Sequence, residues 1–161
     1  MVSASSDNTL AFYPGPFKKL GGSSKDHKNI INSARFSPNG ERLVTVGLDK
    51  SIYMYSGTEI ALQGPVGEEG KAHDKGIVDV DWIGDGHFIT CSNDCSVKLW
   101  DAEERVVQRT LRVDAHQKDK FGNMQVGCAA SGDSLFSVSL CGDLNVWGSL
   151  QAAELEEGAL P

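Results

Sequence analysis

The sequence predicts an all-β protein built from repeated units of short antiparallel strands, and three observations support this class. Four segments share the same order of an apolar strand, a polar turn and an alternating strand that ends in an aromatic residue. Hydroxyl, acidic and aromatic side chains recur in these segments at fixed offsets. Turn-forming sequences such as SPNG and GDG separate neighbouring strands, as tight antiparallel hairpins require.

The turns of the four segments lie at nearly constant intervals along the chain. They are centred on Asp7, Asp49, Asp94 and Cys141, which are 42, 45 and 47 residues apart. A period of roughly 40 to 45 residues is typical of WD repeats, in which four strands form one blade of a β-propeller. The 161 residues therefore predict an incomplete WD-repeat β-propeller of about three and a half blades from a seven-bladed ring.

The strand patterns divide the chain into four units and a tail. The units span approximately residues 1–20, 21–64, 65–113 and 114–150, and residues 151–161 form a frayed tail without a strand pattern. The first unit has no opening strand, and FKKLGG is its candidate outer strand. The second is expected to contain the strands INSARFS, RLVTVG, SIYMYS and EIALQG. The third is expected to contain IVDVDWI, HFITCS, SVKLWD and VVQRTLR, and the fourth MQVGCAA, SLFSVSL and DLNVWG.

Recurring polar side chains predict a buried hydrogen-bonded tetrad in each complete unit. A hydroxyl lies four residues before the turn acid, a large aromatic lies six residues after it, and a histidine precedes the first strand of the unit. Buried polar groups must satisfy one another, and these four types can do so. The predicted tetrads are His73, Thr90, Asp94 and Trp100, and His27, Thr45, Asp49 and Tyr55. The first unit retains only Ser3, Asp7 and Tyr13, and the last has Cys141 in place of the acid.

The hydroxyl, histidine and acid also match the residue types of a nucleophilic triad. The same offsets recur in successive repeats, and a catalytic site has no reason to recur. We therefore interpret the tetrads as structural and expect no enzyme activity. The segment GPVGEEGKAH lacks the spacing and the hydroxyl of a phosphate-binding loop. The four cysteines lack the paired spacing of a zinc site, so we expect reduced thiols and neither metal nor cofactor.

Composition excludes several classes of protein. The formal net charge is −7, which argues against a nucleic-acid-binding protein, since such proteins normally carry a strong basic footprint. No apolar run approaches the roughly 18 to 20 residues that cross a bilayer, and MVSASSDNTL does not have the pattern of a secretory signal. We therefore expect a cytoplasmic chain that does not bind membranes.

An incomplete ring leaves open edges and exposed apolar faces. We therefore expect that missing blades or self-association complete the ring. Within the acidic chain, a basic stretch containing Lys18, Lys19, Lys25, Lys28 and Arg35 is either a solvated surface or a docking surface for an acidic protein.

Several segments together resemble actin-interacting protein 1, a WD-repeat family. The matching segments are TLAFYPGPFKKL, KDHKNIINSARFSPNG, AHDKGIVDVDWIGDG and MQVGCAASGDSLFSVSLCGDLNVW. The family's Gly-Pro-Pro-Phe-Lys-Phe segment has its counterpart in Gly15, Pro16, Phe17 and Lys18. The resemblance covers approximately residues 1–148, and it corresponds to the later blades of the first of two propellers.

The resemblance implies a non-enzymatic protein of the cytoskeleton. Members of the family bind actin filaments decorated with cofilin and promote their severing and disassembly. On this basis the candidate actin and cofilin surface contains Phe17, Lys18, Lys19 and Lys28. The alternative is a generic WD-repeat scaffold that binds another protein partner.

Overall fold

The computed structural model describes residues 1–13, 23–57, 59, 61–112, 121–132 and 134–148. Its strands form four antiparallel sheets that follow one another along the chain. Sheet I consists of β1 (Val2–Ala4), β2 (Leu10–Phe12) and β3 (Ser23–Ser24). Sheet II consists of β4 (Ile31–Phe36), β5 (Arg42–Gly47), β6 (Ile52–Ser56) and β7 (Leu62–Val66).

The second half of the chain repeats this arrangement. A short 3-10 helix, η1 (Glu68–Gly70), leads from sheet II to the next sheet. Sheet III consists of β8 (Ile77–Ile83), β9 (His87–Ser92), β10 (Ser96–Asp101) and β11 (Val107–Arg112). Sheet IV consists of β12 (Gln125–Ser131), β13 (Ser134–Ser139) and β14 (Leu144–Trp147). Within each sheet, consecutive strands pair with one another, as in the hairpin meander of a propeller blade.

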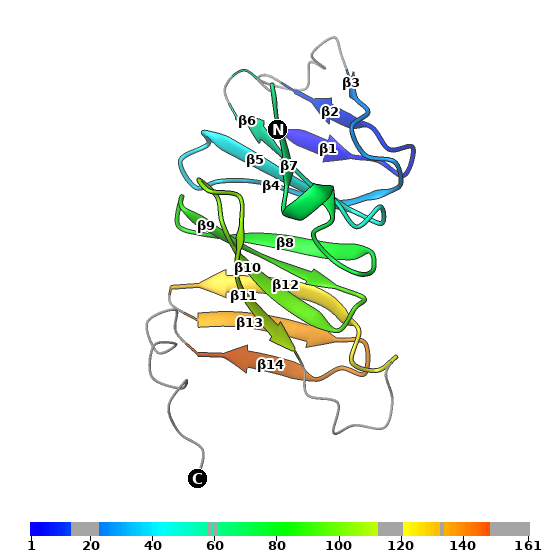
Figure 1. Ribbon diagram of the computed structural model, residues 1–161, viewed down its shortest axis with the longest axis vertical. Coiled ribbons are helices and arrows are strands. Elements are labelled where there is room, and N and C mark those ends of the chain that lie inside the picture. Colours follow the sequence, from blue (N-terminus) through cyan, green and yellow to red (C-terminus); the bar gives the residue numbers. More distant parts are fainter. Residues whose placement is uncertain (14–22, 58, 60, 113–120, 133, 149–161) are drawn as a thin grey trace.

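The four sheets stack on one another in sequence order, from blue to orange in Figure 1. The first strand of each complete sheet lies at one side of the stack, where β4 packs on β8 and β8 packs on β12. This arrangement of antiparallel sheets confirms the predicted all-β fold and the incomplete propeller. The expected strand FKKLGG and the tail at residues 151–161 lie outside the described residues.

The hydrophobic core consists of three layers, each between two successive sheets. The layer between sheets II and III contains Val44, Ile52, Val80 and Phe88, all of which are buried. Each sheet has a forward face, which points toward the next sheet, and a backward face, which points toward the preceding one. Side chains alternate between these faces along every strand, so sheets II and III each contribute to two layers and sheets I and IV to one.

Among the described residues, no helix has the length and the apolar composition needed to cross a bilayer.

Candidate functional site

The tetrad of sheet III forms a continuous chain of hydrogen bonds. His73 lies in the loop before β8, Thr90 on β9, Asp94 in the β9–β10 turn and Trp100 on β10. His73 Nδ1 is 2.9 Å from Asp94 Oδ2, and His73 Nε2 is 2.8 Å from Thr90 Oγ1. Trp100 Nε1 donates to the same Thr90 oxygen at 2.9 Å. All three bonds are satisfied when Nδ1 carries the ring proton and the Thr90 hydroxyl donates to Nε2.

Local hydrogen bonds hold Asp94 in the β9–β10 turn. Its Oδ1 accepts from the Ser96 hydroxyl at 2.5 Å and from the Ser96 backbone N–H at 3.0 Å. Its Oδ2 also accepts from the Asp74 backbone N–H at 3.0 Å. The carboxylate therefore joins the turn to the loop that carries His73, and this contact fixes the histidine in the sheet interior.

The tetrad of sheet II repeats most of this geometry. His27 Nδ1 lies 2.9 Å from Asp49 Oδ2, and His27 Nε2 lies 2.8 Å from Thr45 Oγ1. The Tyr55 ring is buried, and its hydroxyl donates to Asp26 Oδ2 at 2.9 Å. The Tyr53 ring packs edge-on against His27, with the ring centres 4.7 Å apart. The Tyr55 phenol thus donates to an acid outside the predicted tetrad, whereas the equivalent Trp100 donates to the tetrad hydroxyl.

In sheet IV, amide side chains take part in the network around the hydroxyl that a histidine contacts in sheets II and III. Trp147 Nε1 donates to Ser137 Oγ at 3.1 Å. The Asn145 amide bridges Ser137 Oγ and Gln125 Oε1, at 3.4 Å from each. Gln125 is fully buried, and its amide donates to the Asn123 carbonyl at 2.7 Å. The sequence analysis did not predict a role for Gln125. The sequence does contain a clue to it, because this polar residue begins the first strand of its sheet, where sheets II and III have isoleucine.

Hydrogen bonding lowers the pKa of both tetrad acids below the ordinary value of 3.8. Burial raises the pKa of Asp94, but the hydrogen bonds from His73 and Ser96 outweigh this effect. The pKa of Asp49 is lowered in the same way, because burial raises it but the hydrogen bond from His27 and other hydrogen bonds outweigh this effect. Both acids are therefore carboxylates at neutral pH and can accept several hydrogen bonds at once.

The geometry of the sheet III tetrad suits structural support rather than nucleophilic attack. Thr90 is completely buried, and its oxygen already accepts from Trp100. The His73 side chain has no exposed surface. A substrate atom therefore has no path to the Thr90 hydroxyl, and a nucleophile must be reachable within hydrogen-bond distance to act. The tetrad instead ties together the loop, the turn and two strands of one sheet.

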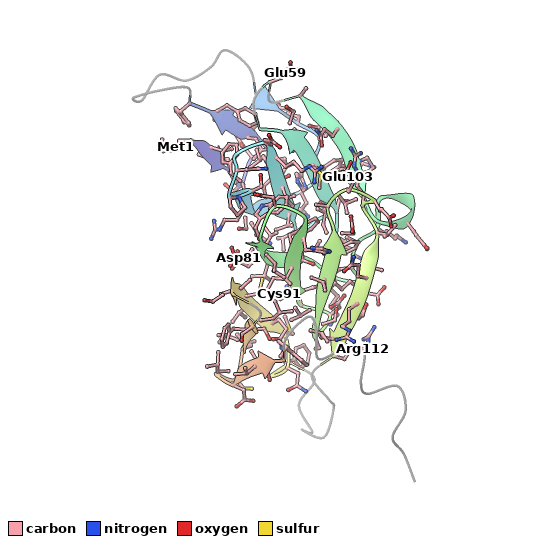
Figure 2. All side chains as sticks on the ribbon, turned by 90° about the vertical axis from the view of Figure 1, so that its left-hand side faces the viewer. Met1, Glu59, Asp81, Cys91, Glu103 and Arg112 are labelled. Atoms are coloured by element: carbon pink, nitrogen blue, oxygen red, sulfur yellow. The ribbon has the colours of Figure 1, made fainter. Side chains whose placement is uncertain are left out.

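Polar side chains of the first strands connect successive sheets. Asp81 Oδ2 on β8 accepts from the Ala130 backbone N–H on β12 at 2.8 Å. Between sheets II and III, Trp82 Nε1 donates to the Arg35 carbonyl at 3.0 Å. Asp81 lies on the left side of Figure 2, close to the boundary between the green sheet III and the yellow sheet IV. These bonds fix the angle at which one sheet follows the next.

The candidate partner surface is only partly described. Phe17, Lys18 and Lys19 lie outside the described residues. Lys28 is exposed, and its backbone N–H donates to Asp49 Oδ2 at 2.8 Å. The carboxylate that holds His27 therefore also fixes the backbone of Lys28. This coupling places a basic side chain at a defined point on the surface.

A hollow of about 510 Å³ lies between the outer strands of sheets II and III. Lys71, Lys98 and Arg105 contribute positive charge to it, and Glu68 and Glu104 contribute negative charge. Two of the cations already have backbone partners, because Lys98 Nζ donates to the Ala72 carbonyl and Arg105 to the Gln63 carbonyl. The hollow therefore has no single charge preference and no convergent set of unpaired donors.

The cysteines are free thiols in the described part of the chain, and no group of three or more metal-ligating side chains gathers there. A hydrogen bond with Cys91 and burial raise the pKa of the Cys128 thiol well above its ordinary value. A thiol with a raised pKa is a poor nucleophile and a poor metal ligand at neutral pH. Cys91 and Cys128 lie in the apolar layer between sheets III and IV and thus act as packing residues.

The WD domain, G-beta repeat model matches residues 18–56 and 67–101. The chain is 36% identical over 146 residues to WD repeat-containing protein 1 of Xenopus tropicalis and 35% identical to that of Mus musculus. It is 33% identical over 143 residues to actin-interacting protein 1 of Drosophila melanogaster. These alignments cover 88–90% of the chain but only 22–23% of each relative. The chain thus spans less than a quarter of the length of these curated relatives.

Proposed function

Because this chain is a WD-repeat protein related to actin-interacting protein 1, we propose that it is a non-enzymatic actin-binding module. In this proposal it binds actin filaments together with cofilin and promotes their severing and disassembly, in the cytoplasm and at the cytoskeleton. The observation that carries the proposal is the similarity to a relative named for its interaction with actin, which extends over 88% of the chain. The cofilin and severing parts rest on the family resemblance of the GPFK and MQVG segments.

The fold supports a role in binding rather than in chemistry. The tetrads of sheets II and III bury their polar groups and make each sheet rigid. A rigid stack of sheets presents its loops at fixed positions, and binding residues are commonly carried by such loops. Lys28 is a described example, because its backbone is held by the buried tetrad acid while its side chain points to solvent.

The basic loop around Lys28 gives the proposal a physical mechanism. Lys25 and Lys28 are both exposed in a chain of net charge −7. A local positive surface on an acidic protein attracts an acidic partner and orients the encounter. The contribution of such charges is screened by salt, so binding through this loop must weaken as the ionic strength rises.

The direct test is cosedimentation of the purified chain with actin filaments, with and without cofilin. We expect more chain in the pellet when cofilin is present, and less as salt is added. Lys28→Glu should weaken the binding about fivefold, which corresponds to roughly 1 kcal/mol. Phe17→Ala combined with Lys18→Ala should weaken it at least as much. The urea midpoints of these variants should match that of the parent chain.

Lys75→Glu is the matched control, because Lys75 is also an exposed lysine, in the loop that follows His73. It should leave pelleting unchanged. Pelleting that does not depend on cofilin would contradict the cofilin part of the proposal. Absence of pelleting under all conditions would reject actin binding by this chain and would favour the generic scaffold with another partner.

A further inference from the structure

The hollow between the outer strands β7 and β11 has the size of a binding site. Its lining comes from the end of β7, the loop around η1, strand β10 and the turn that leads into β11. Its volume of about 510 Å³ lies within the range of roughly 300–1,000 Å³ that is typical of ligand sites. Sheets II and III each pack against a neighbour on both faces, so this hollow does not arise at an end of the stack.

Hydrogen bonds fix the walls of the hollow. Arg105 Nη1 donates to the Gln63 carbonyl at 2.7 Å, and the Arg105 carbonyl accepts from the Gly67 backbone N–H at 3.1 Å. Lys98 Nζ donates to the Ala72 carbonyl at 2.6 Å. These bonds join sheet III to β7 and to the loop before β8. The hollow is therefore preformed, and a preformed site loses less free energy to ordering when a ligand binds.

The floor and one edge of the hollow are apolar. Gly67 has a φ of 91°, and a Cβ atom there would lie 3.3 Å from Trp100 Cζ3, so the backbone passes close to the indole ring that lines the hollow. Val106 and Val107 also line it and are 46% and 43% exposed, and Pro65 is exposed on the opposite wall. Exposed apolar side chains around a preformed hollow fit an apolar side chain of a ligand.

Positive charge lies along the strand that continues the hollow. Thr110 pairs with Lys98 and Arg112 pairs with Ser96, so Arg112 shares the face of Lys98, two residues beyond Thr110. Strand β11 contains no acidic residue. Figure 2 shows Arg112 and Glu103 at opposite ends of sheet III, with Glu103 in the turn that precedes β11. A ligand that leaves the hollow along β11 therefore moves away from an acidic turn toward a basic strand end.

The chemistry of the hollow and its borders fits a peptide better than a small anion. Glu68 and Glu104 line the hollow together with its cations, and these acids would repel a phosphate or a sulfate. Strand β11 is the last strand of sheet III, and one of its edges pairs with no other described strand. Backbone N–H and C=O groups on such an edge can pair with an extended peptide.

We propose that the hollow and β11 bind an extended acidic segment of a partner protein. An apolar side chain of that segment, such as leucine or phenylalanine, fills the space beside Val106 and Val107. The carboxylates that follow it pair with Arg112 and Lys71. The apolar anchor supplies most of the affinity, and the charges set the direction in which the segment lies. This inference does not depend on actin binding, and it concerns a surface other than the loop around Lys28.

Selection from a display library of random peptides, with the Val107→Asp chain as the counter-selection target, tests the proposal. We expect the enriched peptides to share an apolar residue followed closely by aspartate or glutamate. In fluorescence anisotropy titrations of an enriched peptide, Val107→Asp should weaken binding about tenfold, and Lys71→Glu and Arg112→Glu about fivefold each. Added salt should weaken binding as well. The three side chains are exposed, so the urea midpoints of these variants should stay close to that of the parent chain.

Two variants at matched exposed positions serve as controls. Val126→Asp changes an exposed valine on β12, and Lys75→Glu changes an exposed lysine that does not line the hollow. Both chains should bind the enriched peptide as the parent chain does, and loss of binding in either would overturn the proposal. Enrichment of basic or uncharged peptides would overturn it too. So would a selection in which no peptide distinguishes the parent chain from Val107→Asp.

Discussion

Single polar side chains in this protein take part in hydrogen-bond networks that join strands, turns and loops of the same sheet. Thr90 shows this most directly, because its one oxygen is bonded both to the histidine of a loop and to the indole of the next strand. In sheet IV, Asn145 donates to the equivalent serine, Ser137, and also to Gln125 Oε1. The requirement at this position is thus a satisfied hydrogen-bond network rather than a particular set of residues.

At the residue scale we predict that Asp94→Asn destabilises the chain by about 1–3 kcal/mol at neutral pH. The substitution removes the negative charge that accepts hydrogen bonds from His73 and Ser96. Charge-assisted bonds of this kind are stronger than neutral ones. Urea unfolding followed by tryptophan fluorescence measures the change. Asp74→Asn, at an exposed position in the loop that carries His73, should change the unfolding free energy little.

The same residue gives a pH dependence with a definite sign. The pKa of Asp94 is lower in the folded chain than its ordinary value of 3.8, so the folded state binds fewer protons there. The stabilisation is complete well above that value and is lost as the pH falls below about 4 and toward the folded pKa. The unfolding free energy of the parent chain should therefore fall more steeply in acid than that of Asp94→Asn. Equal slopes would contradict this assignment.

At the scale of elements, the bonds between first strands hold successive sheets in place. Asp81→Ala removes the acceptor of the Ala130 backbone N–H and should increase amide hydrogen exchange in β12, at a cost of about 1 kcal/mol. Mass spectrometry of the peptide that covers residues 125–131 measures the effect. Asp85→Ala is the reciprocal control, because Asp85 Oδ1 accepts from Asn39 N in sheet II. It should change exchange near residues 37–41 and leave β12 unchanged.

The sequence predicts most strands because each carries an alternating pattern tied to a repeated marker. VVQRTLR corresponds to β11 at Val107–Arg112, but EIALQG corresponds to β7 at Leu62–Val66, about three residues later. The outer strands contain few buried residues, so no alternation of buried and exposed positions defines where they begin and end. The alternation also predicts that Asp79 and Asp81 share one face. It cannot predict their partners, Cys128 N and Ala130 N, because these belong to a strand 49 residues away that contributes only its backbone.

In the part of the chain that the structure describes, the sheets form a stack in which the main contacts join successive sheets. In such stacks stability is close to a sum of terms for each unit and each interface. Sheets II and III are covered on both faces, and their central strands β5 and β9 are buried along almost their whole length. Sheet IV is covered by described residues on its backward face only, so the exposed side chains of Leu144 and Val146 contribute little to its stability.

We therefore predict that native-state hydrogen exchange divides the molecule into parts of unequal stability. At low protein concentration, amides of β13 and β14 should exchange by openings about 2 kcal/mol less costly than those of β5, which corresponds to roughly 30-fold faster exchange. Uniform exchange across all four sheets would show that the chain opens as one unit and that the interfaces do not act independently.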